Sequence, residues 1–186
     1  MAQTPSVMVD LGRQAPDFSL PDTKTNKLMS LGQAKGSKGT VIMFLCNHCP
    51  YVKHVNDQLI KLSNDYTPLG ISFVAINSND TEAFPEDGPE EMKRVAEALG
   101  YPFPYLFDST QEVARAYEAA CTPDFFVYNK SLRLVYRGQL DYARPKNDKP
   151  VDGVSIRKAL DDLLNGRPIE PNQIPSVGCN IKWKTG

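Results

Sequence analysis

The stretch Val41-Ile42-Met43-Phe44-Leu45-Cys46-Asn47-His48-Cys49-Pro50 decides the expected fold. Residues 40–45 form a short apolar run rich in β-formers, and such a run predicts a central strand that is covered on both faces. Pro50 stands where the first turn of a helix would begin, and its ring is suited to that position. Apolar residues then follow at three- and four-residue steps, namely Val52, Val55, Leu59, Leu62 and Tyr66. The pattern predicts a strand that leads through Cys-x-x-Cys directly into an amphipathic helix.

Further strands and helices are expected on both sides of this junction, in one α/β domain over residues 1–186 with a mixed sheet. Strands are predicted at 71–76, 105–107, 125–128 and 132–137, the last two as a hairpin, with a short strand in the lead-in 12–21. Helices are predicted to begin at Pro89, at a capping box Ser109-x-x-Glu112 and at an N-cap Ser155. Residues 32–39 are expected to form a loop, and residues 167–186 an irregular tail that wraps over the domain.

Composition excludes several classes of partner and location. The chain has 186 residues and 41% hydrophobic side chains, enough for one domain with a sizeable core. Lys and Arg number 21 against 22 Asp and Glu, so no basic excess favours nucleic acid or a membrane surface. The longest apolar run, 41–46, is far short of the roughly 20 residues of a spanning helix. The first residues show no secretory signal, so a cytoplasmic location is expected.

The cysteine pair Cys46 and Cys49 carries the expected chemistry. A helix N-terminus bears a partial positive charge and unpaired N–H groups, and both stabilise a thiolate. A thiolate is the nucleophile of thiol–disulfide exchange, and a second cysteine one turn further on can resolve the mixed disulfide. As an imidazolium, His48 would favour the Cys46 thiolate further. The pair is therefore predicted to be redox-active.

A metal site is the alternative interpretation of the same pair. A complete zinc site usually has a second closely spaced pair of ligands, and the chain offers only two histidines, His48 and His54. We therefore expect no bound metal and no other cofactor. A metal-binding or metallochaperone module using Cys46, Cys49 and His48 stays open as a hypothesis from a different class.

Three motifs carry a resemblance to a known family: Ala15-Pro16-Asp17-Phe18, Cys46-Asn47-His48-Cys49-Pro50 and Thr122-Pro123. They resemble the thioredoxin-like superfamily, and most closely its redoxin branch of peroxiredoxin-like proteins. The resemblance implies a thioredoxin-like fold with a redoxin-type insertion within 79–107. It also implies a cis-proline at Pro123 that faces the cysteine pair.

The activity that this resemblance implies is thiol–disulfide exchange. Cys46 is expected to attack and Cys49 to resolve, with His48 tuning the thiolate and Pro123 shaping the substrate-docking surface. Asn47 and Thr122 are expected to contact the substrate. The implied partners are protein or small-molecule thiols and disulfides, together with an electron donor such as thioredoxin or glutathione.

Peroxide reduction by Cys49, an antioxidant activity, is the second hypothesis. Peroxiredoxins use a P-x-x-x-T-x-x-C pattern and an Arg that activate peroxide. When Cys49 is set on their reactive cysteine, Ile42 takes the place of the Pro, Cys46 that of the Thr, and their Arg falls close to Pro123. These departures place thiol–disulfide exchange ahead of peroxide reduction.

Other residues have weaker signals. Cys121 lies two residues before Pro123, which would bring it near the active pair, although a buried core cysteine is an equal alternative. Cys179 could be a distant resolving thiol, but a packed or exposed cysteine is favoured. His54 is expected to be a solvated helix residue. The acidic turn 85–89 is expected to be a plain helix entry rather than a docking loop for a partner.

Overall fold

The structure is a computed structural model, and it describes residues 3–185. The strands are β1 (Gln3–Pro5), β2 (Ser19–Asp22), β3 (Lys27–Ser30), β4 (Gly39–Phe44), β5 (Ile71–Asn77), β6 (Tyr105–Phe107), β7 (Cys121–Thr122), β8 (Asp124–Asn129), β9 (Leu134–Arg137) and β10 (Val177–Asn180). The helices are α1 (Leu31–Ala34), α2 (Pro50–Tyr66), α3 (Pro89–Leu99), α4 (Glu112–Tyr117) and α5 (Val154–Leu164), with 3-10 turns at Thr67–Leu69 and Pro85–Asp87.

The main sheet is mixed, and β4 lies inside it. Its strand order is β3-β2-β6-β5-β4-β8-β9. β4 runs parallel to β5 and antiparallel to β8, and all six of its residues are buried. β4 therefore has the covered, central position that its continuous apolar run predicts.

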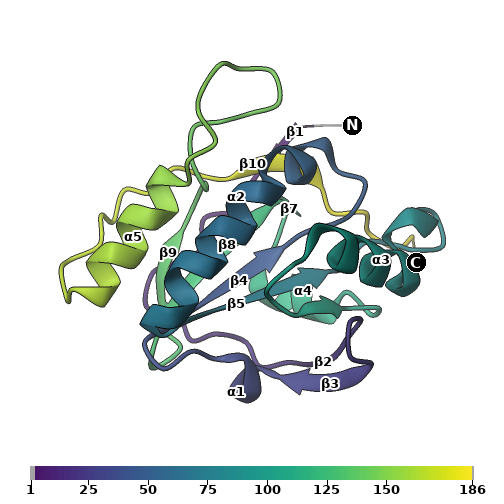
Figure 1. Ribbon diagram of the computed structural model, residues 1–186, viewed down its shortest axis with the longest axis horizontal. Helices are drawn as coiled ribbons and strands as arrows, with labels where there is room; N and C mark the ends of the chain where they lie inside the picture. The colour runs from purple at the N-terminus through teal and green to yellow at the C-terminus, as the bar shows by residue number, and fades with distance from the viewer. Residues whose placement is uncertain (1–2, 186) are drawn as a thin grey trace.

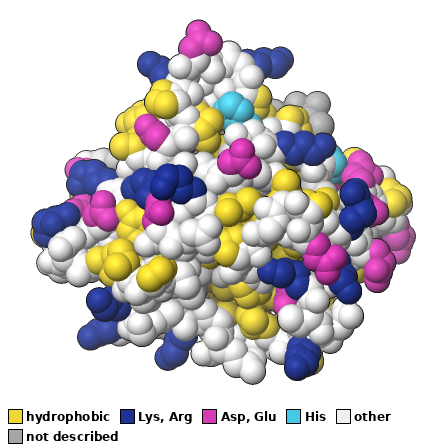
Figure 2. Space-filling model, in the orientation of Figure 1, with side chains coloured by type: hydrophobic (Ala, Val, Ile, Leu, Met, Phe, Trp, Pro, Cys, Tyr) yellow, Lys and Arg dark blue, Asp and Glu magenta, His cyan; other side chains and the backbone are white. Residues whose placement is uncertain are grey.

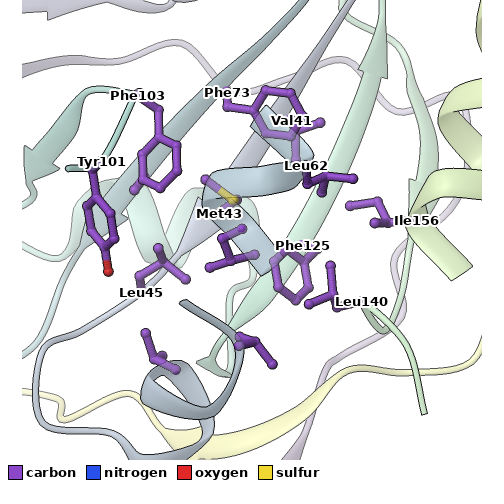
Figure 3. Close-up of a cluster of buried hydrophobic side chains, with 14 of the residues drawn as sticks. Val41, Met43, Leu45, Leu62, Phe73, Tyr101, Phe103, Phe125, Leu140 and Ile156 are labelled. Carbon is purple, nitrogen blue, oxygen red and sulfur yellow. The ribbon is translucent and has the colours of Figure 1, made fainter. Parts of the chain in front are cut away.

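Helices cover both faces of this sheet. Val41 and Met43 point from β4 into a cluster with residues of α2 and α5, whereas Ile42 and Phe44 pack on the other face with α1 and α4. Figure 3 shows the first cluster, with Met43 among side chains from several elements. Figure 1 shows α2 lying across the sheet with α5 beside it. All five predicted apolar positions of α2 are buried, so the helix predicted from Pro50 is confirmed.

Two predicted helix caps are wrong. The N-cap of α4 is Gln111 rather than Ser109, and the first turn of α4 is held instead by Asp108, whose carboxylate accepts hydrogen bonds from backbone N–H groups, one of them that of Ala114 at 2.9 Å. α5 has Gly153, in the left-handed region at φ 68°, as its N-cap, so Ser155 is already inside that helix. Asp108 and Gly153 take these roles through local geometry that a cap motif does not encode.

Two segments expected to be irregular contain regular structure. The expected loop 32–39 overlaps α1, which a capping box between Ser30 and Gln33 begins. The expected irregular tail 167–186 contains β10, which lies between β1 and β7 in a second small sheet. The tail prediction is wrong for β10, because that strand depends on partners more than 50 residues away in sequence.

Charges of both signs are scattered over the face drawn in Figure 2, which agrees with the formal net charge of −1. Within residues 3–185, none of the helices combines the length and the apolar character needed to cross a bilayer.

Candidate active site

The two cysteines of the Cys-x-x-Cys lie where β4 passes into α2. Cys46 follows the end of the strand, and Cys49 is the N-cap of α2 with Pro50 in the first turn. Both side chains are buried, with exposed fractions of 2% for Cys46 and 0% for Cys49. The sulfur of Cys49 therefore lies at the positive end of a 17-residue helix.

Thr122 and Pro123 lie next to the cysteine pair, just before β8, the strand that pairs with β4. The Thr122–Pro123 peptide bond is cis, as predicted, and the register of β4 with β8 places the next residue opposite Phe44. The Cys46 sulfur lies 3.3 Å from the Thr122 hydroxyl, and the Cys49 sulfur lies 3.2 Å from the Thr122 carbonyl oxygen. Thr122 and Pro123 are themselves buried, so any contact of either residue with a substrate requires the site to open.

The surroundings of the two sulfurs act on their pKa values in opposite directions. Hydrogen bonding from Cys46, aided by Cys179 and by the backbone of Val52 in the first helical turn, lowers the pKa of Cys49 from 9.0 to about 5. The pKa of Cys46 is raised, first by its hydrogen bond to Cys49, then by burial and by the carboxylate of Asp87. These surroundings favour the thiolate on Cys49, at the helix N-cap, whereas the sequence led us to expect it on Cys46.

His48 is held by Asp87. Its Nδ1 lies 2.5 Å from the Asp87 carboxylate, and its ring stacks on Phe84 with 5.2 Å between ring centroids. Asp87 therefore binds the imidazole that we expect to act on Cys46, and one ligand atom of each of the three residues lies within 4.8 Å of the others. The negative charge of Asp87 acts on the Cys46 thiol in the opposite sense to the expected imidazolium.

Asp87 is the residue of the site that sequence reasoning missed. It is fully buried, and its carboxylate accepts hydrogen bonds from the backbone N–H groups of Asn47 and His48 and from the side-chain amide of Asn79. It belongs to the acidic turn 85–89, which was expected to be a plain helix entry. An Asp between two prolines is visible in the sequence, but its contact with a loop 40 residues earlier is not.

Asn47 has a structural role in this geometry. Its amide nitrogen donates to the carbonyl oxygen of Glu86 at 2.8 Å, and its amide oxygen accepts from the Tyr105 hydroxyl at 3.1 Å. The expected substrate contact by Asn47 would have to compete with these two bonds.

One group of possible metal ligands lies here. Cys46, His48 and Asp87 each offer a ligand atom within 4.8 Å of the others. Both Asp87 oxygens already accept hydrogen bonds from protein donors, one of them from His48 itself. His48 Nε2 has no hydrogen-bond partner in the part of the chain that the structure describes, so only a metal ion bound through His48 Nδ1 would have to displace the bond between His48 and Asp87.

The other candidate residues named from the sequence differ in how close they lie to the cysteine pair. The Cys179 sulfur lies 2.8 Å from that of Cys49, so the tail cysteine is part of the site. Cys121 is buried with its sulfur 3.6 Å from the Pro123 carbonyl oxygen, and burial raises its pKa. His54 lies in α2, is half-buried and lines a cavity of about 20 Å³ beside Pro123, so it is less exposed than a fully solvated helix residue.

Known proteins match the whole chain or its larger part. The sequence model of the AhpC/TSA family matches residues 11–137. A thiol-disulfide oxidoreductase ResA of Halalkalibacterium halodurans is 26% identical over 67% of this chain, and the match spans 65% of that relative's length.

Two solved structures show how far the fold is shared. An uncharacterized conserved protein from Geobacillus kaustophilus is 59% identical, covers 100% of this chain and 98% of its own, and has a TM-score of 0.98. The thioredoxin domain of a thiol-disulfide oxidoreductase from Bacteroides vulgatus is 16% identical, with coverage of 82% and 99% and a TM-score of 0.62. At that identity the second likeness concerns the fold alone, and it confirms the predicted thioredoxin-like architecture.

Proposed function

The chain belongs to the AhpC/TSA family, and from this membership and the geometry of its thiols we propose that it is a thiol–disulfide oxidoreductase. Cys46 and Cys49 form its redox couple. The observation that carries the proposal is the Cys49 sulfur at the N-cap of α2, within reach of a second thiol and facing the cis-proline segment.

The geometry favours Cys49 as the nucleophile. Its thiolate attacks one sulfur of a substrate disulfide, a mixed disulfide forms, and the other substrate sulfur leaves as a thiolate. Cys46 then attacks the Cys49 sulfur, the internal disulfide forms, and the second substrate sulfur leaves with the proton of Cys46. Two electrons pass from the cysteine pair to the substrate, and the reverse sequence oxidises a dithiol.

The pKa of Cys46 suits it to the second step, the attack on the mixed disulfide that Cys49 has formed. While Cys49 is a thiolate, its negative charge and its hydrogen bond raise the pKa of Cys46. A mixed disulfide on Cys49 removes both effects, so Cys46 ionises more easily at the stage at which it must attack. The Thr122 hydroxyl, 3.3 Å away, can donate to the thiolate that then forms.

A redox titration against a glutathione couple, followed by insulin reduction, tests this proposal. We expect a two-electron transition with a Cys46–Cys49 disulfide in the oxidised wild-type protein, and we expect Cys49→Ser to abolish both this transition and the turnover of insulin. Cys121→Ala is the matched control, because its sulfur contacts a backbone carbonyl rather than the pair. A wild-type protein that forms no Cys46–Cys49 disulfide at any potential would contradict the proposal.

Peroxide reduction is a second candidate, favoured by the lowered pKa of Cys49. Orienting donors around the peroxide usually supply the largest part of such catalysis, about 10²–10³ in rate for one donor. In this chain Cys46 and Ile42 stand where peroxiredoxins have Thr and Pro. We therefore expect hydrogen peroxide to react no faster than with an ordinary thiol of equal thiolate fraction. A far faster rate, lost in Cys49→Ser but kept in Cys46→Ser, would make the protein a peroxidase.

The electron donor and the location stay predictions. Thioredoxin or glutathione in a reducing cytoplasm fits a cysteine pair that must be returned to the dithiol after each turnover. Reduction of the oxidised protein by each donor, and cell fractionation, would test them.

A further inference from the structure

Three sulfur atoms meet at the N-terminal end of α2. Cys46 stands three residues before Cys49 in the Cys-x-x-Cys, and the Cys49 sulfur lies 2.8 Å from that of Cys179. Cys179 is 130 residues further along the chain and is buried, with 2% of its surface exposed. The thiol–disulfide exchange proposed above uses only Cys46 and Cys49, so it assigns no role to Cys179.

The fold fixes Cys179 in this place. Its strand β10 pairs with β1 on one side and with β7 on the other, so that Cys179 lies opposite both Gln3 and Thr122. The preceding Gly178 allows the approach, because a Cβ atom there would lie 2.0 Å from the Thr122 carbonyl oxygen. Figure 1 shows β10 passing beside the N-terminal end of α2. The contact with Cys49 therefore depends on two strand ladders and a close backbone approach, not on a loose tail.

We propose that Cys179 is a second resolving thiol, which attacks the Cys49 sulfur in competition with Cys46 and gives the oxidised protein a second disulfide form, Cys49–Cys179. This inference rests on the proposed function, because it needs Cys49 to enter disulfides. In the exchange, the Cys179 sulfur bonds to Cys49, the Cys46–Cys49 bond breaks, and Cys46 leaves as a thiolate that takes up the proton of Cys179. No external oxidant is consumed, because one disulfide replaces another.

While Cys46 and Cys49 are reduced, the surroundings of Cys179 disfavour its thiolate. Burial and the neighbouring Cys49 raise the pKa of Cys179 to about 12, whereas Lys182 acts in the opposite sense. Once Cys49 is in a disulfide, its negative charge is gone and Cys179 ionises more easily. The two oxidised forms differ in which thiol is free: Cys179 in β10, or Cys46 beside Asp87 and Thr122.

Ellman's reagent, an aromatic disulfide, gives a stoichiometric test. Attack by Cys49 releases one equivalent of thionitrobenzoate, and resolution of the mixed disulfide by a neighbouring thiol releases a second. In a Cys121→Ala background we expect two equivalents from Cys46→Ser, and one from the double variant Cys46→Ser/Cys179→Ser, whose mixed disulfide persists. One equivalent from Cys46→Ser, with the label retained on Cys49, would overturn the proposal.

Disulfide mapping of the Cys121→Ala protein, oxidised by glutathione disulfide and then alkylated and digested, completes the test. We expect both Cys46–Cys49 and Cys49–Cys179 peptides, and only the first from Cys179→Ser. If only Cys46–Cys49 forms, the inference fails while the proposed function stands; if neither forms, the proposed function fails. Circular dichroism of each variant, compared with the wild type, identifies any that does not fold, and alanine variants at the same positions then replace it.

Discussion

At the scale of single residues, the site is organised by what surrounds each sulfur. The Cys49 sulfur lies at a helix N-terminus, 2.8 Å from the Cys179 sulfur and 3.2 Å from the Thr122 carbonyl oxygen. Cys46 lies near the buried carboxylate of Asp87, which opposes its ionisation. The same carboxylate holds His48 and the backbone between the cysteines. One acidic residue therefore holds the loop between the cysteines and, after the hydrogen bond with Cys49 and burial, also contributes to raising the pKa of Cys46.

The first prediction concerns the Cys49 thiolate and pH. Its pKa is lowered from 9.0 when unperturbed to about 5 in the folded protein, so the folded state binds fewer protons between these values. The free energy of unfolding of the reduced protein, compared with Cys49→Ala, should therefore rise with pH across this window, by at most about 1.4 kcal/mol per pH unit. The contribution is complete above the unfolded pKa and is lost as pH falls through the folded pKa.

Urea titrations of reduced protein at several pH values across this window measure the effect. Cys46→Ala removes the largest cause of the lowered Cys49 pKa and should therefore reduce the slope, whereas Cys49→Ala should abolish this contribution. A slope that disappears in Cys46→Ala and survives in Cys49→Ala would assign the thiolate to Cys46 instead.

The second prediction concerns Asp87. Replacing it with Ala leaves the buried amide of Asn79 and the backbone N–H of Asn47 without their acceptor. Leaving such groups unpaired should lower the free energy of unfolding by about 3 kcal/mol. The neighbouring Glu86 is exposed, and Glu86→Ala should change stability by no more than about 0.5 kcal/mol. Chemical denaturation of both variants gives the comparison, and equal effects would show that Asp87 does not organise the loop.

At the scale of elements, β10 depends most on a single position. It lies between β1 and β7, and Gly178 is the point at which it approaches the cis-proline segment. A side chain on Gly178 would force β10 away from Thr122 and would move Cys179 away from Cys49. β10 therefore joins β1 to β7 and also positions the thiol of Cys179.

The third prediction follows from that close approach. Gly178→Ala should lower the free energy of unfolding by about 3 kcal/mol, since a buried Cβ cannot be placed without shifting backbone. It should also reduce formation of the Cys49–Cys179 disulfide. Gly32→Ala is the matched control: its Cβ would meet nothing closer than 3.8 Å, and a helical alanine there should be neutral or stabilising by about 0.4–1 kcal/mol. Similar stability of both variants would show that β10 can move freely.

The elements predicted best from the sequence are those with a local cause. β4 and α2 follow from one apolar run and one helical period, and the junction between them places the cysteine pair. The caps of α4 and α5 were mispredicted because Asp108 and Gly153 act through backbone geometry. Asp87 and Cys179 reach the site through contacts 40 and 130 residues away in sequence, which no local pattern encodes.

At the scale of the whole molecule, the reactive sulfurs are closed off from solvent. Helices cover both faces of the sheet, and β10 closes the remaining side of the pair. Cys49 has no exposed surface, and Cys46 and Thr122 each have 2%. Exchange with a protein disulfide therefore requires a transient opening around the N-terminal end of α2, and such local openings cost less than global unfolding.

The last prediction concerns this opening. Because the thiolate must become accessible before it reacts, the observed rate with Ellman's reagent should rise with reagent concentration and then level off at the opening rate. Urea below the unfolding transition should raise that plateau, since it stabilises exposed surface. Stopped-flow absorbance on reduced protein measures both effects, and methyl methanethiosulfonate, a smaller reagent, should react faster at equal concentration. A rate that stays proportional to reagent concentration, at the value of a free thiol with the same thiolate fraction, would show that the pair is accessible without any opening.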